Sequence, residues 1–121
     1  MWCVVIIAID FDGTITTKRD DEHYLELQTK CKKAIMYLFF QGHQLILNTC
    51  RQGNQLEVAK AFLYQNGIID FFIEINNNTK DTLDKYEDDC RKISADMYID
   101  DRNFGGFPGW EAIIKYFEEV I

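Results

Sequence analysis

Short apolar runs alternate along the chain with longer stretches in which apolar residues recur at helical spacing. Four apolar runs predict strands: residues 3–9, 44–48, 71–75 and 97–99. The stretches between and after them predict helices: residues 25–40, 56–65, 82–91 and 110–121. Strands that alternate with helices are typical of a parallel sheet covered by helices. We therefore expect an α/β fold of the Rossmann-like type, with three α/β/α layers and a mostly parallel central sheet.

The chain shows no internal repeat and no linker. Its 121 residues, 47% of them hydrophobic, are enough for one domain with a core of useful size. We expect a single domain over residues 1–121, in which Gly42 and Gly67 stop the first two helices. The polar stretch 14–26 is expected to form a loop or a short flap.

Polar side chains directly follow three of the predicted strands, in three clusters: Asp10 and Asp12, Thr49 and Arg51, and Asp100 and Asp101. In parallel sheets, ligands bind at the carboxyl ends of the strands, so we expect the clusters to converge. Two carboxylates one residue apart at the end of a buried strand resist joint ionisation unless a cation or hydrogen bonds compensate. A bound divalent metal is the simplest explanation.

The chemistry of the three clusters fits phosphoryl transfer. Carboxylates are hard oxygen ligands that suit Mg²⁺, an ion that takes few carboxylates and also binds substrate phosphate. Thr49 offers a hydroxyl, and a lysine would complete the charge balance. A metal, positioned donors and a carboxylate nucleophile can together form and hydrolyse an aspartyl-phosphate.

These motifs resemble those of the haloacid dehalogenase (HAD) superfamily, in its small capless bacterial form. The segment Asp10-Phe11-Asp12-Gly13-Thr14 is similar to the first motif of the family. Residues 47–49 resemble the second, a strand that ends in Thr, and residues 98–101 resemble the acidic fourth motif. The resemblance covers nearly the whole chain and implies a HAD-type fold. The short segments between the motifs leave no room for a full cap domain.

The resemblance implies a Mg²⁺-dependent phosphatase that acts through an aspartyl-phosphate. Asp10 would be the nucleophile, and Asp12 the general acid and base, which also binds the metal through its backbone carbonyl. Thr49 would hydrogen-bond the transferring phosphoryl group. The metal would lie among Asp10, Asp12, Asp100 and Asp101, with Asp100 as a direct ligand and Asp101 as a further ligand or a support behind it.

The lysine of the third motif is assigned to Lys92, just before the fourth strand, with Lys80 as the alternative. Such a lysine would neutralise charge on the phosphoryl oxygens. Cys50 and Arg51 flank the phosphate site as substrate contacts. A packed small residue is the favoured alternative for Cys50, and a solvated side chain is an equal alternative for Arg51.

Aromatic residues are expected mainly in the core. This applies to Phe39-Phe40, to Tyr116-Phe117, and to Phe104 and Trp110 beside the fourth motif, which could otherwise form a substrate wall. If some of these rings stay exposed, a homo-oligomer becomes plausible.

Charge and cysteine content limit the classes of partner and the cellular compartment that we expect. The net charge is −7 and no basic block is present, which disfavours general nucleic-acid binding. Four cysteines without a CxxC pair favour a reducing, cytoplasmic compartment. The apolar N-terminus is too short to span a membrane. The expected partner is a phosphorylated substrate, either a small molecule or a larger one.

Two other functions compete with a phosphatase. One is a HAD-like domain with weak or no turnover, which binds metal, phosphoryl ligands or a protein partner. The other is a receiver-like module that is phosphorylated on an aspartate. Motif order disfavours the receiver, because the third strand ends in Glu74-Ile75-Asn76, without an aspartate to accept the phosphate.

Overall fold

The computed structural model describes residues 4–17, 25–85 and 93–119. Its elements, in chain order, are β1 (Ile6–Ile9), α1 (Cys31–Phe40), β2 (Gln44–Leu47), α2 (Gly53–Gln65), the 3₁₀ turn η1 (Ile69–Phe71), β3 (Phe72–Ile75), α3 (Lys80–Lys85), β4 (Met97–Ile99) and α4 (Trp110–Glu119). Lys92 and most of the expected flap lie outside the described residues. None of the described helices is long and apolar enough to cross a membrane.

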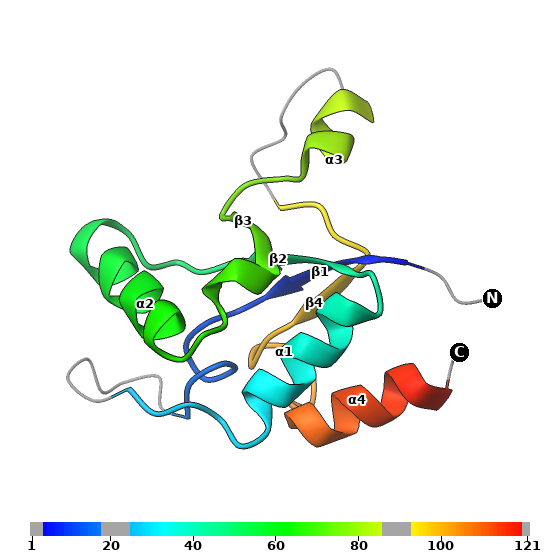
Figure 1. Ribbon diagram of the computed structural model, residues 1–121, viewed down its shortest axis with the longest axis horizontal. Coiled ribbons are helices and arrows are strands. Elements are labelled where there is room, and N and C mark those ends of the chain that lie inside the picture. The colour runs from blue at the N-terminus through cyan, green and yellow to red at the C-terminus, as the bar shows by residue number, and fades with distance from the viewer. Residues whose placement is uncertain (1–3, 18–24, 86–92, 120–121) are drawn as a thin grey trace.

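The four strands form one sheet in the order β3-β2-β1-β4, and every neighbouring pair is parallel. The prediction of an α/β fold with a parallel sheet is confirmed, and the arrangement is compatible with a Rossmann-like fold (Figure 1). The chain moves outward from β1 to β3 and then crosses to β4 on the other side of β1. The direction of the connections therefore reverses between β1 and β4, which is where such sheets bind ligands.

Helices α1, α2 and α4 lie on one side of the sheet, and α3 lies on the other (Figure 1). Side chains alternate along β1, so Ile7 and Ile9 face the main core, where they pack with residues of α1, α2 and α4. Ala8 of β1 and Ile46 of β2 are buried and lie outside this cluster. Burial on both faces explains the continuous apolar run of β1.

Glycines stop both long helices as predicted. Gly42 follows α1 with φ 96°, and the amide of His43 donates a hydrogen bond of 3.2 Å to the carbonyl of Leu38. This is the 6→1 bond of a Schellman motif, which requires a residue in the left-handed region. Gly67, with φ 72°, ends α2 in the same way.

The segment before α1 differs from its prediction. Thr14, Ile15 and Thr16 are fully buried instead of forming a polar loop. The amide of Thr17 donates to the carbonyl of Glu26 over 2.9 Å, so residues 25–28 run as an extended partner of residues 15–17. Because this pairing occupies its backbone, the helix predicted from residue 25 begins only at Cys31.

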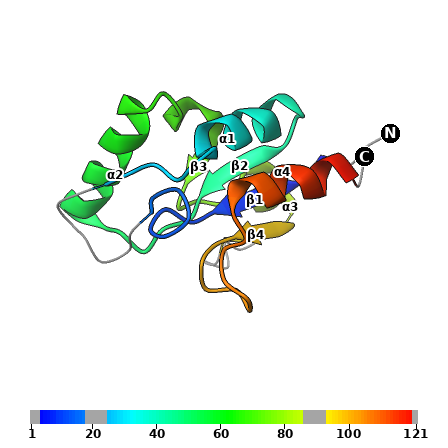
Figure 2. The ribbon, with the colours of Figure 1, turned by 90° about the horizontal axis from the view of Figure 1, so that it is seen from below.

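The prediction that the aromatic side chains lie in the core is correct for only some of them. Phe117 and Trp110 are buried, and the indole N–H of Trp110 donates to the carbonyl of Thr14 over 2.9 Å. The exposed aromatic side chains are Phe39, Phe40, Phe104 and Tyr116, so the prediction of core positions was wrong for them. Helix α4 packs against α1 (Figure 2), and that contact leaves the outer side of α4 with Tyr116 facing solvent.

Candidate functional site

A cavity of about 310 Å³ lies at the carboxyl ends of β1, β2 and β4. Its lining brings together residues from all three predicted clusters: Asp10, Asp12, Asn48, Thr49, Cys50, Asp100 and Arg102. Two backbone hydrogen bonds fix this edge of the sheet. The amide of Asp10 donates to the carbonyl of Ile99 over 2.9 Å, and the amide of Asn48 donates to the carbonyl of Ile9 over 2.8 Å. The cavity therefore lies at an edge where all three strands are held together by backbone hydrogen bonds.

A tight turn follows β1 and separates the two aspartates of the first motif. The amides of Thr14, Ile15 and Thr16 all donate to the carbonyl of Phe11, over 3.3, 3.0 and 3.1 Å. The ring of Phe11 is fully buried and meets Phe62 of α2 edge-on. Because Phe11 is anchored in the core, the side chains on either side of it line the cavity. Phe11 takes this position in a turn and not in a continuation of β1.

The carboxyl group of Asp10 is electrostatically disfavoured. The pKa of Asp10 is raised to about 6, mainly by burial and in addition by the nearby carboxylates of Asp101, Asp12 and Asp100, against a backbone hydrogen bond from Phe11 that lowers it. Asp10 therefore lies in a partly buried and acidic environment.

The donor set fits Mg²⁺. Asp10, Asp12 and Asp100 present carboxylates to one cavity, and a cation there would offset the cost of ionising Asp10. Among the described residues, no three acidic, histidine or cysteine side chains form a ready-made cage for a metal. Mg²⁺ does not need such a cage, because it commonly keeps several waters and uses one or two carboxylates together with substrate phosphate.

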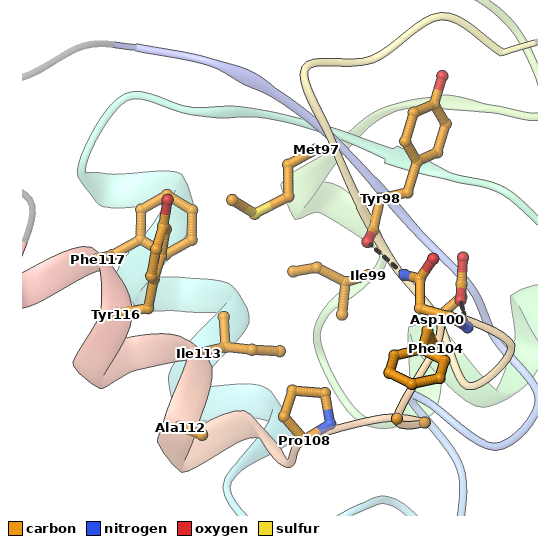
Figure 3. Close-up of a pocket in the computed structure, with 13 residues that line it drawn as sticks. Met97, Tyr98, Ile99, Asp100, Phe104, Pro108, Ala112, Ile113, Tyr116 and Phe117 are labelled. Atoms are coloured by element: carbon orange, nitrogen blue, oxygen red, sulfur yellow. Dashed lines mark hydrogen bonds between the residues drawn. The ribbon is translucent and has the colours of Figure 1, made fainter.

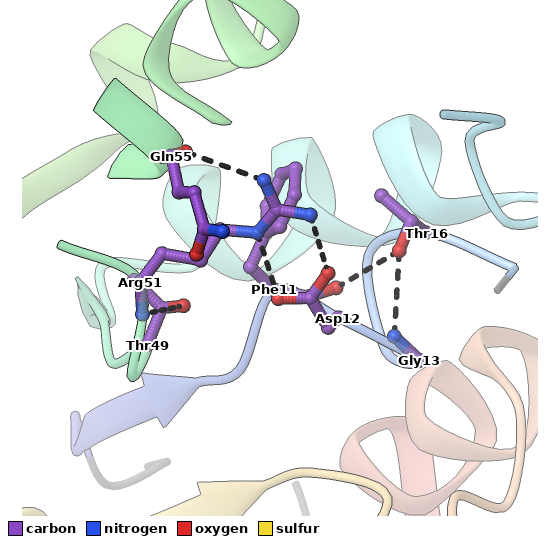
Figure 4. A network of polar contacts seen from close by, with 7 residues as sticks. All are labelled: Phe11, Asp12, Gly13, Thr16, Thr49, Arg51 and Gln55. Atoms are coloured by element: carbon purple, nitrogen blue, oxygen red, sulfur yellow. Dashed lines mark hydrogen bonds and ion pairs between the residues drawn. The ribbon is translucent and has the colours of Figure 1, made fainter. Parts of the chain in front are cut away.

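Arg51 binds Asp12 through both arms of its guanidinium group (Figure 4). Nε lies 2.8 Å from Oδ2 of Asp12, and Nη2 lies 2.8 Å from Oδ1. The guanidinium carbon stands 5.0 Å from the centre of the Phe11 ring, and Nη1 donates to the carbonyl of Gln55 over 3.3 Å. The side chains of Arg51 and Asp12 are only 11% and 24% exposed. The interpretation of Arg51 as a solvated side chain is therefore wrong.

Thr49 is held in place by Asn76, a residue that the sequence did not single out. The Thr49 amide donates to Oδ1 of Asn76 over 2.8 Å, and the Thr49 hydroxyl accepts from the amide of Arg51 over 3.2 Å. Asn76 has φ 56° and directly follows β3. Asn76 is a polar residue at the carboxyl end of β3, and this position was the sequence signal that could have identified it.

The two aspartates after β4 have different surroundings. Asp100 lines the cavity, and its Oδ1 accepts from the amides of Arg102 and Asn103 over 3.0 and 2.9 Å. Asp101 is half-buried and does not line the cavity, yet it lies close enough to Asp10 to raise the pKa of that carboxyl. Arg102 lines the cavity and was not predicted from the sequence.

The structure does not place a lysine in the cavity among the residues it describes. Lys80 is exposed at the start of α3 and does not line the cavity, and Lys92 lies outside the described residues. In the described part of the lining, the basic residue is Arg102. Cys50 is exposed and lines the cavity, so the alternative of a packed small residue is wrong.

Comparison with known proteins gives a likeness to a solved structure. The chain matches no protein-family model and no curated protein. A conserved protein from Bacteroides thetaiotaomicron, whose structure is solved, is 31% identical to it and superimposes with a TM-score of 0.81. The likeness covers 97% of this chain and 92% of that protein, so it extends over nearly the whole of both.

We expect the Asp10→Asn variant to be more stable than the unmodified chain at pH 7.5 in the absence of divalent cations. The pKa of Asp10 is about 6 in the folded chain and near 3.8 when unperturbed. The folded state therefore loses stability as pH rises from about 4 to 6, and the penalty is complete above pH 6. Because the side chain is only partly buried, the gain should be about 1–2 kcal/mol in the free energy of unfolding.

Urea unfolding in EDTA at pH 7.5 and at pH 4 measures this difference. The gain should nearly vanish at pH 4, and Asp84→Asn, a change at an exposed position on α3, should show no gain at either pH. An Asp10→Asn variant with the same stability as the unmodified chain at pH 7.5 would contradict the proposed crowding of carboxylates.

Proposed function

We propose that this chain, which belongs to the same family as the conserved Bacteroides thetaiotaomicron protein, is a Mg²⁺-dependent phosphoester hydrolase of the HAD type. The observation that carries the proposal is the cavity at the carboxyl ends of β1, β2 and β4, where Asp10 and Asp12 lie beside Thr49 and Asp100. Phosphoryl transfer requires a nucleophile, a second carboxylate close to it and a hydroxyl donor. This edge of the sheet brings the three together.

In this proposal, Asp10 attacks the phosphorus atom of a phosphate monoester, and the ester oxygen leaves with a proton from Asp12. Asp12 then takes a proton from a water molecule, which attacks the phosphorus of the aspartyl-phosphate and frees both Asp10 and inorganic phosphate. Thr49, whose amide is fixed by Asn76, hydrogen-bonds the phosphoryl oxygens during both steps. The two carboxylates thus take separate roles although they are neighbours.

The metal would be held by the carboxylates of Asp10 and Asp100 and by the backbone carbonyl of Asp12, with Asp101 behind them. It would supply positive charge that offsets the negative charge on the phosphoryl oxygens. Arg102 in the cavity adds to this charge. The proposal keeps Lys92 as the lysine of the third motif. It also keeps a cytoplasmic location, which the free thiols of Cys31 and Cys50 favour.

Arg51 links substrate binding to the availability of Asp12. Both oxygens of Asp12 accept from the guanidinium group, so release by Arg51 would free Asp12 for proton exchange. A phosphate group offers Arg51 an equivalent pair of acceptor oxygens. We propose that Arg51 moves from Asp12 to the substrate phosphate, which frees the acid and base when substrate is present.

The same ion pair supports a second candidate function. A site whose Asp12 is permanently held by Arg51 would bind metal or phosphoryl ligands with weak or no turnover. The two candidates differ in whether phosphate is released, and the assay below separates them. A receiver-like module is less well supported, because Asn76 stands where its phosphorylated aspartate would be needed.

We expect the purified chain to release phosphate from a panel of phosphate monoesters in Mg²⁺, and Asp10→Asn to lower kcat by about 1,000-fold or more, because it removes the nucleophile. Chelation with EDTA should abolish release, and added Mg²⁺ should restore it. Asp84→Asn serves as the control and should leave kcat unchanged.

Failure of the whole panel would count against the phosphatase. If Mg²⁺ still raised the melting temperature of the unmodified chain, and did so less for Asp10→Asn, the result would favour the binding domain with little turnover.

We expect Arg51→Lys to raise KM by about 10-fold while kcat changes by less than about threefold. Lysine keeps the charge but cannot bind phosphate through two parallel hydrogen bonds, and it holds Asp12 less firmly. Steady-state kinetics with one substrate measure both constants, with Lys33→Gln on the exposed side of α1 as the control. A rise in kcat at unchanged KM would instead make Arg51 a brake on Asp12 without a role in binding.

A further inference from the structure

A second cavity, of about 490 Å³, lies between β4, α4 and the loop that joins them (Figure 3). β4 is an edge strand, and α4 packs against α1, so the described helices leave this space open beside β4. The joining loop projects away from the rest of the chain (Figure 2). The volume is within the range of small-molecule sites, about 300–1,000 Å³.

The lining of this second cavity is apolar and aromatic. Ile99 and Ile113 are buried at its base, and Pro108 and the exposed rings of Phe104 and Tyr116 stand around it (Figure 3). Phe104 is fully exposed, and a large apolar ring in that position gains nothing from packing within the described chain. Aromatic rings pair favourably with other aromatic rings, so a flat ring is the natural occupant.

The two cavities adjoin at Asp100, which lines both of them. Among the described residues that line the second cavity, the charged side chain is that of Asp100. It lies at the end of the cavity nearest to Asp10 and Asp12. A charged leaving group would therefore lack a partner deeper in the cavity. A phosphate placed beside Asp10 would have its ester substituent directed across Asp100 into an uncharged, apolar space.

We propose that the cavity between β4 and α4 binds the leaving group of the substrate, and that the substrate is a small phosphate monoester of an uncharged aromatic alcohol. This inference rests on the proposed phosphatase function. It assigns substrate recognition to the loop that contains Phe104, in a chain whose short inter-motif segments leave no room for a full cap domain. Phe104 stacks on the aromatic ring, and Tyr116 closes the opposite side.

The test compares 1-naphthyl phosphate with glycerol 2-phosphate on the full chain in Mg²⁺. Because a naphtholate leaves more readily than an alkoxide from any phosphatase, the comparison uses KM and not rate. Phe104→Ala should raise KM for 1-naphthyl phosphate about 10-fold, at unchanged kcat, and leave KM for glycerol 2-phosphate unchanged. The matched control is Phe40→Ala, which removes a different exposed ring that lies on α1. It should change neither KM.

Binding separates this inference from the proposed function. Calorimetry of 1-naphthyl phosphate with the Asp10→Asn variant should give a dissociation constant that Phe104→Ala weakens about 10-fold, whether or not the unmodified chain shows turnover. Binding without turnover would overturn the phosphatase and keep the aromatic site. Turnover with equal KM for the two esters and no effect of Phe104→Ala would overturn the aromatic site and keep the phosphatase. A clear preference for a phosphotyrosine peptide over 1-naphthyl phosphate would overturn the assignment of a small substrate.

Discussion

The site depends on the cost of gathering carboxylates at one edge of a parallel sheet. Asp10, Asp12, Asp100 and Asp101 come from the ends of two neighbouring strands, and their mutual repulsion adds to the desolvation that raises the pKa of Asp10 to about 6. Arg51 relieves this cost for Asp12. Among the described residues, this edge of the sheet therefore carries more carboxylates than basic side chains, and such perturbed groups are common at functional sites.

The sheet can hold such a cluster because β1 is supported on every side. Hydrogen bonds continue from β1 to both neighbours as far as its last residue, and Ile7 and Ile9 pack into the main core. Phe11 then anchors the turn by burying its ring between the two aspartates. Repulsion between the carboxylates therefore acts against a backbone that these hydrogen bonds and packing contacts hold in place.

The sequence predicted those features that depend on local pattern. The apolar runs located all four strands, and Gly42 marked a helix end because a left-handed residue is needed there. The strand ends also identified most residues of the cavity, since parallel strands bring their carboxyl ends together. Features that depend on distant contacts were not accessible. The ion pair of Arg51 with Asp12 spans 39 positions, and the bond from Thr49 to Asn76 spans 27.

Exposure of aromatic rings was the other property that local pattern could not supply. Phe104 lies in a short loop beside the acidic motif, and its neighbours suggested a core position. The structure leaves it in solvent because α4 packs towards α1, which opens a space beside the edge strand. Asp100 then belongs to two environments at once, acidic on one side and apolar on the other. A molecule that fits both must be charged at one end and apolar at the other, with its polar bond near Asp100. A phosphate ester of an aromatic alcohol has this distribution of charge, and its scissile bond joins the two parts.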